Sequence, residues 1–230
     1  MTDETLHAAI ATTPEKNAAP FADFFARARA RLDFTLPPAL TDRSIVPSRG
    51  DHETDKLVMK AARELPIRPA AVLIPVVEHA DEPSVLLTLR ASHLSDHPGQ
   101  VAFPGGKIDA ADASPLDAAL REAEEEIGLA RTFVEPLGFL DVYATSFGFR
   151  IIPVVALVRP GFSLAINRDE VDDAFEVPLS FLMSPDNHLR HSRDFKGITR
   201  SFYAMPYQDR YIWGVTAGIV RGLYERIVAE

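Results

Sequence analysis

The chain contains no cysteine among its 230 residues. Without a thiol, it has no disulfide, no thiolate zinc site and no cysteine nucleophile. Long apolar runs are also missing. The two longest, near residues 70–77 and 151–158, are about eight residues each and contain a proline, whereas a membrane-spanning helix needs roughly 20. The N-terminal segment MTDETLHAAIATTPEK lacks the apolar core of a secretory signal. These absences predict a cytoplasmic protein without a membrane partner.

Basic side chains are scarce and scattered. The chain has 24 Lys and Arg against 33 Asp and Glu, a formal net charge of −9. No basic stripe marks a nucleic-acid footprint, so we expect no nucleic-acid partner and disfavour RNA decapping. By contrast, seven acids and one base lie between residues 109 and 126. This concentration of carboxylates suggests a cation site rather than general solubility.

Residues 1–66 are expected to form a helical, partly loop-like N-terminal extension. An amphipathic helix is predicted at residues 21–32 and a short helix near residues 55–64, with a proline-punctuated loop between them. The apolar side of the first helix carries Phe21, Phe24 and Phe25. Exposed aromatic rings are a liability, so this helix is expected to pack on its own domain or on the second subunit of a homodimer.

Residues 67–230 are expected to form the main domain. The pattern predicts strands at residues 69–77, 84–90, 134–143, 149–158, 169–177 and 199–205. It predicts helices at residues 115–127, 178–183 and 212–228. Strands before, between and after the helices favour an α+β, layered architecture.

The acidic helix at residues 115–127 has clear boundaries. Ser114 is suited to cap its start, Pro115 to the first helical position and Gly128 to the left-handed conformation that ends a helix. At about 100° per residue, three carboxylates fall together at the edge of the apolar face. They are Glu122, Glu125 and Glu126, whereas Glu124 and Asp117 point to water.

This arrangement of carboxylates carries an electrostatic cost. Like charges three and four residues apart repel each other, and carboxylates in the last turn oppose the helix dipole. Divalent cations would remove both penalties, and Arg121 can pair with one of the glutamates to fix its rotamer. The glycine pair Gly105–Gly106 before the helix allows close approach of the backbone. A merely solvated acidic face is the alternative interpretation.

The second half of this segment, Arg121-Glu122-Ala123 followed by Glu125-Glu126 and Gly128-Leu129, resembles the Nudix box of Nudix hydrolases. The first half departs from that pattern. Asp112 stands where a glutamate is expected, and one extra residue separates it from Arg121. We therefore assign Asp112 no ligand role.

A second resemblance narrows the family. Residues 86–91 (LLTLRA) and 99–106 (GQVAFPGG) are similar to the motif of the coenzyme A pyrophosphatase branch, as is Tyr211-Ile212-Trp213-Gly214-x-Thr216. Ser95 stands where that motif usually carries arginine. This departure leaves open a Nudix hydrolase for ADP-ribose, NADH or another nucleotide. The alternative that is not an enzyme is a non-catalytic domain that senses a nucleotide.

The resemblance implies an α/β/α sandwich with a mixed sheet, in which the box forms a loop–helix–loop. It also implies Mg²⁺ or Mn²⁺ dependence and a small nucleotide substrate. For the coenzyme A branch, the products would be 3′,5′-ADP and 4′-phosphopantetheine or its acyl form.

Candidate roles follow from the motif and its surroundings. The predicted catalytic residues are Glu122, Glu125 and Arg121. The predicted metal ligands are Glu122, Glu125, Glu126 and a carbonyl of Gly106. The predicted substrate contacts are Arg90, Gly105, Lys107 and His97. The general base is left open between a box glutamate and a later acid, namely Glu170, Asp172 or Asp173.

Overall fold

The computed structural model describes residues 23–55, 64–195 and 198–229. Its α-helices are α1 (Phe24–Arg31), α3 (Pro115–Ile127), α4 (Leu179–Leu182) and α5 (Val215–Ile227). Its strands are β1 (Arg49–Gly50), β2 (Arg68–Val77), β3 (Ser84–Arg90), β4 (Val101–Ala102), β5 (Gly105–Lys107), β6 (Val134–Phe139), β7 (Tyr143–Ala144), β8 (Phe149–Val158), β9 (Val171–Pro178), β10 (Leu189–Phe195), β11 (Ile198–Tyr207) and β12 (Arg210–Trp213). None of the helices described is long and apolar enough to cross a membrane.

A mixed sheet forms the centre of the molecule, in the order β1-β7-β8-β2-β3-β4, with β5 beside β2, β6 beside β8 and β9 beside β3. Strands β2 and β8 run parallel over their whole length, from Arg68 opposite Phe149 to Val77 opposite Val158. The pairs β2–β3, β2–β5 and β3–β9 are antiparallel. The predicted α+β class with a mixed sheet is therefore confirmed.

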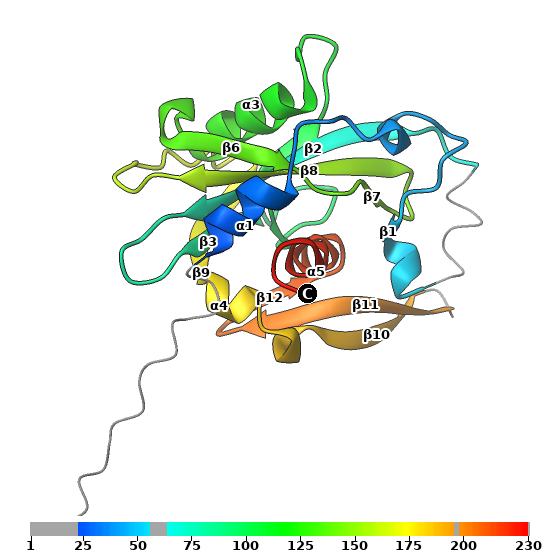
Figure 1. The fold of residues 1–230 in the computed structure, drawn as a ribbon. Helices are drawn as coiled ribbons and strands as arrows, with labels where there is room; N and C mark the ends of the chain where they lie inside the picture. Colours follow the sequence, from blue (N-terminus) through cyan, green and yellow to red (C-terminus); the bar gives the residue numbers. More distant parts are fainter. Residues whose placement is uncertain (1–22, 56–63, 196–197, 230) are drawn as a thin grey trace, which may run out of the picture.

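Helices cover both faces of this sheet (Figure 1). Side chains alternate between the two faces along a strand, so β2 contributes Leu73 to one apolar cluster and Ile74 to the other. Helix α3 packs on the first face through Ala119, Ala123 and Ile127. Helices α1 and α5 pack on the second face. The layers are those of an α/β/α sandwich, and α3 holds the acidic face next to β5 and β2.

A second, three-stranded sheet lies beyond α5, in the order β10-β11-β12 (Figure 1). The sequence predicted only part of β11 and missed β10. The prediction of one helix over residues 212–228 is wrong at its start, because Ile212 and Trp213 belong to β12 and pair with β11. Gly214 then takes a left-handed φ of 63°, and α5 begins at Val215.

Two other predicted boundaries shift. The single strand expected at residues 134–143 is divided into β6 and β7, with a register irregularity between Pro136 and Gly138. The predicted short helix near residues 55–64 and the position of Phe21 fall largely outside the described residues.

The extension packs against the main domain. Phe24 and Ala28 of α1 are 1% and 0% exposed and join the core cluster that includes α5. The Arg31 guanidinium donates hydrogen bonds to the carbonyls of Arg226, Ile227 and Ala229 at the end of α5. The first helix thus buries its apolar side on its own chain, which removes one reason to expect a homodimer. The homodimer itself stays a prediction.

Candidate functional site

The glycine pair brings the β5 backbone against both the sheet and α3. At Gly105, φ is +153°, and an added Cβ would lie 2.4 Å from the carbonyl oxygen of Ala71. At Gly106, an added Cβ would lie 2.5 Å from Oε1 of Glu122. The Gly105 N–H donates a hydrogen bond of 3.1 Å to Oε2 of Glu126. A side chain at Gly105 would collide with the β2 backbone, whereas one at Gly106 would displace the end of the Glu122 side chain.

Local signals place α3 as predicted. The Ser114 hydroxyl accepts a hydrogen bond from the Asp117 N–H at 3.1 Å, and Pro115 occupies the first turn. Gly128 ends the helix with φ at 68°. Because both ends are set, Glu122 and Glu126 face β5 from successive turns of one helix face.

A third carboxylate joins them from elsewhere in the chain. Ligand oxygens of Glu122, Glu126 and Glu170 all lie within 4.8 Å of one another. The segment that carries Glu170 is attached to the end of α3 by two backbone hydrogen bonds, from Ala165 N–H to Ile127 and from Asn167 N–H to Glu126, both 2.9 Å. The sequence named Glu170 only as a candidate base, because no spacing signal links it to the helix.

Burial changes the protonation of this cluster. Glu126 is 4% exposed, and its burial raises the pKa to about 8, although the Gly105 N–H opposes the shift. Burial also raises the pKa of the half-buried Glu122, against the influence of Arg121. Buried carboxylates at such short separation are costly unless a cation neutralises them. An all-oxygen donor set of this kind suits Mg²⁺ or Mn²⁺.

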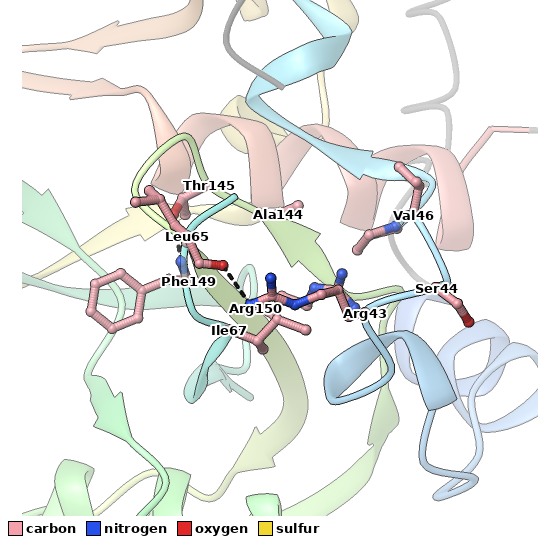
Figure 2. Close-up of a pocket in the computed structure, with 11 residues that line it drawn as sticks. Arg43, Ser44, Val46, Leu65, Ile67, Ala144, Thr145, Phe149 and Arg150 are labelled. Atoms are coloured by element: carbon pink, nitrogen blue, oxygen red, sulfur yellow. Dashed lines mark hydrogen bonds between the residues drawn. The ribbon is translucent and has the colours of Figure 1, made fainter. Parts of the chain in front are cut away.

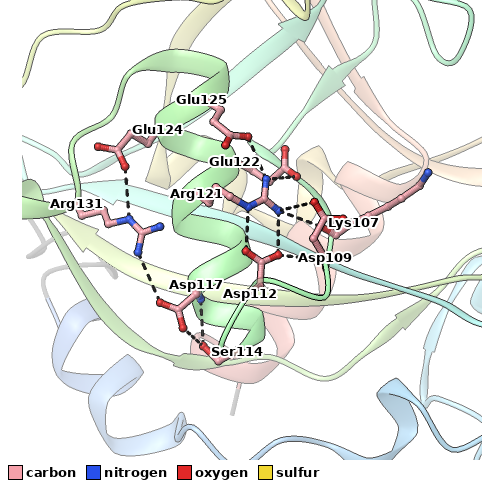
Figure 3. A network of polar contacts seen from close by, with 10 residues as sticks. All are labelled: Lys107, Asp109, Asp112, Ser114, Asp117, Arg121, Glu122, Glu124, Glu125 and Arg131. Atoms are coloured by element: carbon pink, nitrogen blue, oxygen red, sulfur yellow. Dashed lines mark hydrogen bonds and ion pairs between the residues drawn. The ribbon is translucent and has the colours of Figure 1, made fainter.

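Arg121 is held by carboxylates on both sides, as Figure 3 shows. Its guanidinium donates to both oxygens of Asp112 at 2.9 Å, and to Glu122 and Glu125 at 3.0 Å. The Arg121 hydrogen bonds lower the pKa of Asp112 to about 2. Asp112 is therefore a partner of Arg121, and the pair orients Glu122. The sequence alone did not predict this role for Asp112.

Glu125 is the predicted ligand that the structure does not bring into the cluster. Its side chain is 56% exposed and is bonded to Arg121. Glu124 turns to the far side of the helix, as the helical projection predicted, where Arg131 lies between it and Asp117 (Figure 3).

The predicted substrate-binding residues differ in where the structure places them relative to the cluster. Arg90, at the end of β3, lies near enough for its charge to lower the pKa of Glu126 against the larger effect of burial. Its Nε is buried and has no hydrogen-bond partner among the described residues. The Lys107 side chain points away from Arg121 (Figure 3). The His97 ring lies edge-on to Phe147, with centroids 6.1 Å apart, and Phe147 is 56% exposed.

A separate pocket of about 270 Å³ lies where the extension meets the start of β8 (Figure 2). Arg43 and Arg150 line it, but both arginines are used by the chain itself. Arg43 donates to the Leu65 carbonyl at 3.0 Å, and Arg150 donates to the Asp42 carbonyl at 2.6 Å. The pocket contains none of the predicted site residues.

Comparisons with known proteins identify the domain. The family model described as "NUDIX domain" matches residues 67–196. A relative from Enterobacter sp. (strain 638), named an uncharacterized Nudix hydrolase, NudL, is 42% identical over 156 residues, which is 68% of this chain and 81% of the relative. The protein of that name from Yersinia pestis (strain Pestoides F) is 43% identical over 162 residues, 70% of this chain and 80% of the relative. The solved structure of a C. elegans Ap4A hydrolase gives a TM-score of 0.41 at 18% identity, covering 46% of this chain and 77% of that chain.

Proposed function

Since the chain belongs to the Nudix hydrolase family, whose members hydrolyse diphosphate bonds, we propose that its substrate is coenzyme A or a derivative. The products would be 3′,5′-ADP and 4′-phosphopantetheine or its acyl form. The observation that carries the hydrolytic part is the group of Glu122, Glu126 and Glu170 against the Gly105–Gly106 backbone. The motif at residues 86–106 supports the choice of coenzyme A.

The three glutamates would hold Mg²⁺ or Mn²⁺, and the Gly106 carbonyl is a further candidate ligand. A divalent ion supplies charge neutralisation for the diphosphate and lowers the pKa of bound water. Glu125 stays a predicted ligand, although its contact with Arg121 favours a supporting role. The Asp112–Arg121 pair keeps Glu122 in one rotamer, which reduces the reorganisation needed on binding.

Among the later acids, Glu170 is the best-supported general base. Asp173 is paired with Arg210 at 2.6 Å, and Asp172 accepts the Ser92 N–H at 2.9 Å. Glu170 is exposed and belongs to the cluster, so one of its carboxylate oxygens can ligate the cation while the other meets a water molecule that attacks the diphosphate. A base must reach the proton it removes within hydrogen-bond distance or through one water, and Glu170 meets that requirement best.

Recognition of the substrate rests on Arg90 and the loop that follows it. The Arg90 guanidinium lies close enough to influence Glu126, and its charge would pair with a phosphate oxygen held beside that carboxylate. The exposed Phe147 beside His97 offers a ring on which adenine can stack. Lys107 stays a candidate contact at the rim.

Ser95 supports a second candidate, a Nudix pyrophosphatase for ADP-ribose, NADH or another nucleoside diphosphate derivative. It leaves this chain without an arginine that the coenzyme A motif usually carries. A sensing domain without catalysis is less well supported, because Glu122, Glu125 and Glu126 are all present.

The deciding experiment incubates the full chain with Mg²⁺ and either coenzyme A or ADP-ribose, and identifies the products by mass. We expect 4′-phosphopantetheine and 3′,5′-ADP from coenzyme A. Cleavage of ADP-ribose alone would keep the diphosphate hydrolysis and reject the proposed substrate. Cleavage of neither, by a protein that binds the metal, would favour the sensing domain.

A further inference from the structure

Several aromatic side chains lie next to one another on the outer face of the three-stranded sheet. Side chains alternate along the strands, so Ile212 of β12 enters the core while its neighbours Tyr211 and Trp213 face outward. The Trp213 ring lies 5.1 Å from Phe202 and 6.4 Å from Tyr211, centroid to centroid. His191 of β10 stacks on Tyr211 at 6.0 Å and contacts its hydroxyl at 2.6 Å.

These rings line an open groove of about 530 Å³. That volume is within the range of roughly 300–1,000 Å³ that is common for small-molecule sites. Tyr211 is 41% exposed, so part of the ring surface is available to a ligand. Flat rings that lie side by side bind other flat rings well, and stacking of a base on an aromatic side chain contributes about 1–3 kcal/mol.

The groove is basic although the chain is acidic overall. Among the described residues, its lining includes Arg190 and Arg193 and no carboxylate, in a chain with a net charge of −9. Arg190 donates a hydrogen bond to the Glu53 carbonyl, and its guanidinium lies over the ring of Tyr203 on the opposite face of the sheet. Arg193 is therefore the arginine that faces the rings. Arg193 has no hydrogen bond or ion pair within the part of the chain that the structure describes, and is exposed. An unpaired arginine beside stacked rings favours an occupant that is both aromatic and anionic.

The described residues that line this groove lie on β10, β11 and β12, and none of them belongs to the glutamate cluster. Helix α3 covers one side of the central sheet, and the three-stranded sheet lies beyond α5 on the other side (Figure 1). A molecule held by the groove would contact the outer face of this sheet, while β12 approaches the segment after Glu170 at Arg210, which pairs with Asp173 at 2.6 Å.

We propose that the groove is a second, non-hydrolytic site that binds a mononucleotide, with its base on Tyr211 and Trp213 and its phosphate at Arg193. A second copy of the chain is less suitable, because a two-fold interface would bring the same arginines together without a carboxylate. A nucleic-acid strand is also less suitable, because two arginines do not make a basic path over several phosphates.

Trp213 is the chain's one tryptophan, so its fluorescence reports on this groove directly. The experiment adds AMP, which has no diphosphate bond, to the full chain with a metal chelator present, and follows the emission. We expect saturable quenching. Replacing Arg193→Ala should weaken the apparent affinity about tenfold, the loss that one charged hydrogen bond predicts, and Tyr211→Ala should weaken it about as much through lost stacking.

Two matched variants separate this site from other effects. Arg159→Ala removes an arginine that is 63% exposed and paired with Glu135 elsewhere on the surface, and Glu126→Gln alters the glutamate cluster. Both should bind AMP as the unchanged chain does, and Arg193→Ala should leave hydrolysis unchanged. The proposal is overturned by absent quenching, by equal weakening in the two arginine variants, by a requirement for an oligonucleotide, or by quenching that follows self-association in light scattering.

Discussion

Glu126 shows how one residue combines burial with charge. It is 4% exposed, accepts the Gly105 N–H and shares the cluster with Glu122 and Glu170. Replacing Glu126→Gln keeps its shape and one acceptor oxygen but removes the charge that a cation needs. We expect turnover to be abolished while the fold is retained, measured by hydrolysis and circular dichroism.

The matched control for this prediction is Glu124→Gln. Glu124 neighbours Glu126 in sequence, but its side chain is 54% exposed and lies on the far side of α3 beside Arg131. It should keep normal turnover. Normal hydrolysis by a folded Glu126→Gln variant would contradict the proposed metal site.

The raised pKa of Glu126 predicts a pH-dependent stability in the absence of metal. Its pKa is about 8 in the folded chain, raised by burial from the ordinary value of 4.5. Between these values the unfolded state has lost the proton and the folded state has kept it, so folded stability falls as pH rises and then levels off. In chelator, Glu126→Gln should melt close to the unchanged chain near pH 5 and roughly 5 °C or more above it near pH 9. An equal difference in melting temperature between the two proteins at both pH values would refute the raised pKa of Glu126.

A substitution at Gly106 tests whether the close approach of the β5 backbone to the Glu122 carboxylate matters for activity. A Cβ there would meet the end of the Glu122 side chain at 2.5 Å, which can move at small cost. Gly106→Ala should therefore fold normally but displace Glu122 and lower kcat/KM by about tenfold or more. Gly222→Ala is the control, because a Cβ at Gly222 meets nothing within 4 Å. Equal activity in both variants would remove the role of Gly106.

The residues of the site could be predicted where the signal is local. Glu122 and Glu126 share one helix face by spacing, and the glycine pair precedes them. Glu170 lies far along the chain and reaches the cluster only because its segment bonds to the end of α3. The Asp112 contact with Arg121 likewise depends on the fold of a loop, which no periodicity encodes.

Helix α3 is the element with the clearest local code, and its predicted bounds are confirmed. Replacing Ser114→Ala removes the acceptor for the Asp117 N–H. We expect the free energy of unfolding to fall by about 1 kcal/mol in urea denaturation, as is typical for a lost N-cap, with hydrolysis per folded molecule unchanged. Loss of hydrolysis at unaltered stability would show that Ser114 acts in the site instead.

Elements that depend on distant partners were harder to predict. Strand β10, LRHSRDF, is polar at an edge and is defined by its pairing with β11. The apolar residues Tyr211–Trp213 continue into those of α5, so periodicity alone extended the helix backward through β12. In both cases the pairing of strands overrides the local pattern.

At the scale of the whole molecule, α1 ties the extension to the main domain. We propose that residues 67–230 form the hydrolase domain and residues 1–66 its extension. Phe24→Ala should lower the free energy of unfolding by about 3–5 kcal/mol in urea denaturation, because it empties a fully buried ring site. Phe34→Ala, at a ring that is 50% exposed, should cost much less. A similar cost for both would place α1 outside the cooperative core.

The attachment of the Glu170 segment to the end of α3 has a thermodynamic consequence. A cation shared by Glu122 and Glu170 would act as a removable cross-link between two distant parts of the chain. It would hold together the ends of the loop between them, and so would offset the entropy cost of closing that loop on folding. Since such an ion binds the folded chain and not the unfolded one, its concentration would set the folding equilibrium by mass action. The ion that serves the reaction would then also stabilise the folded state.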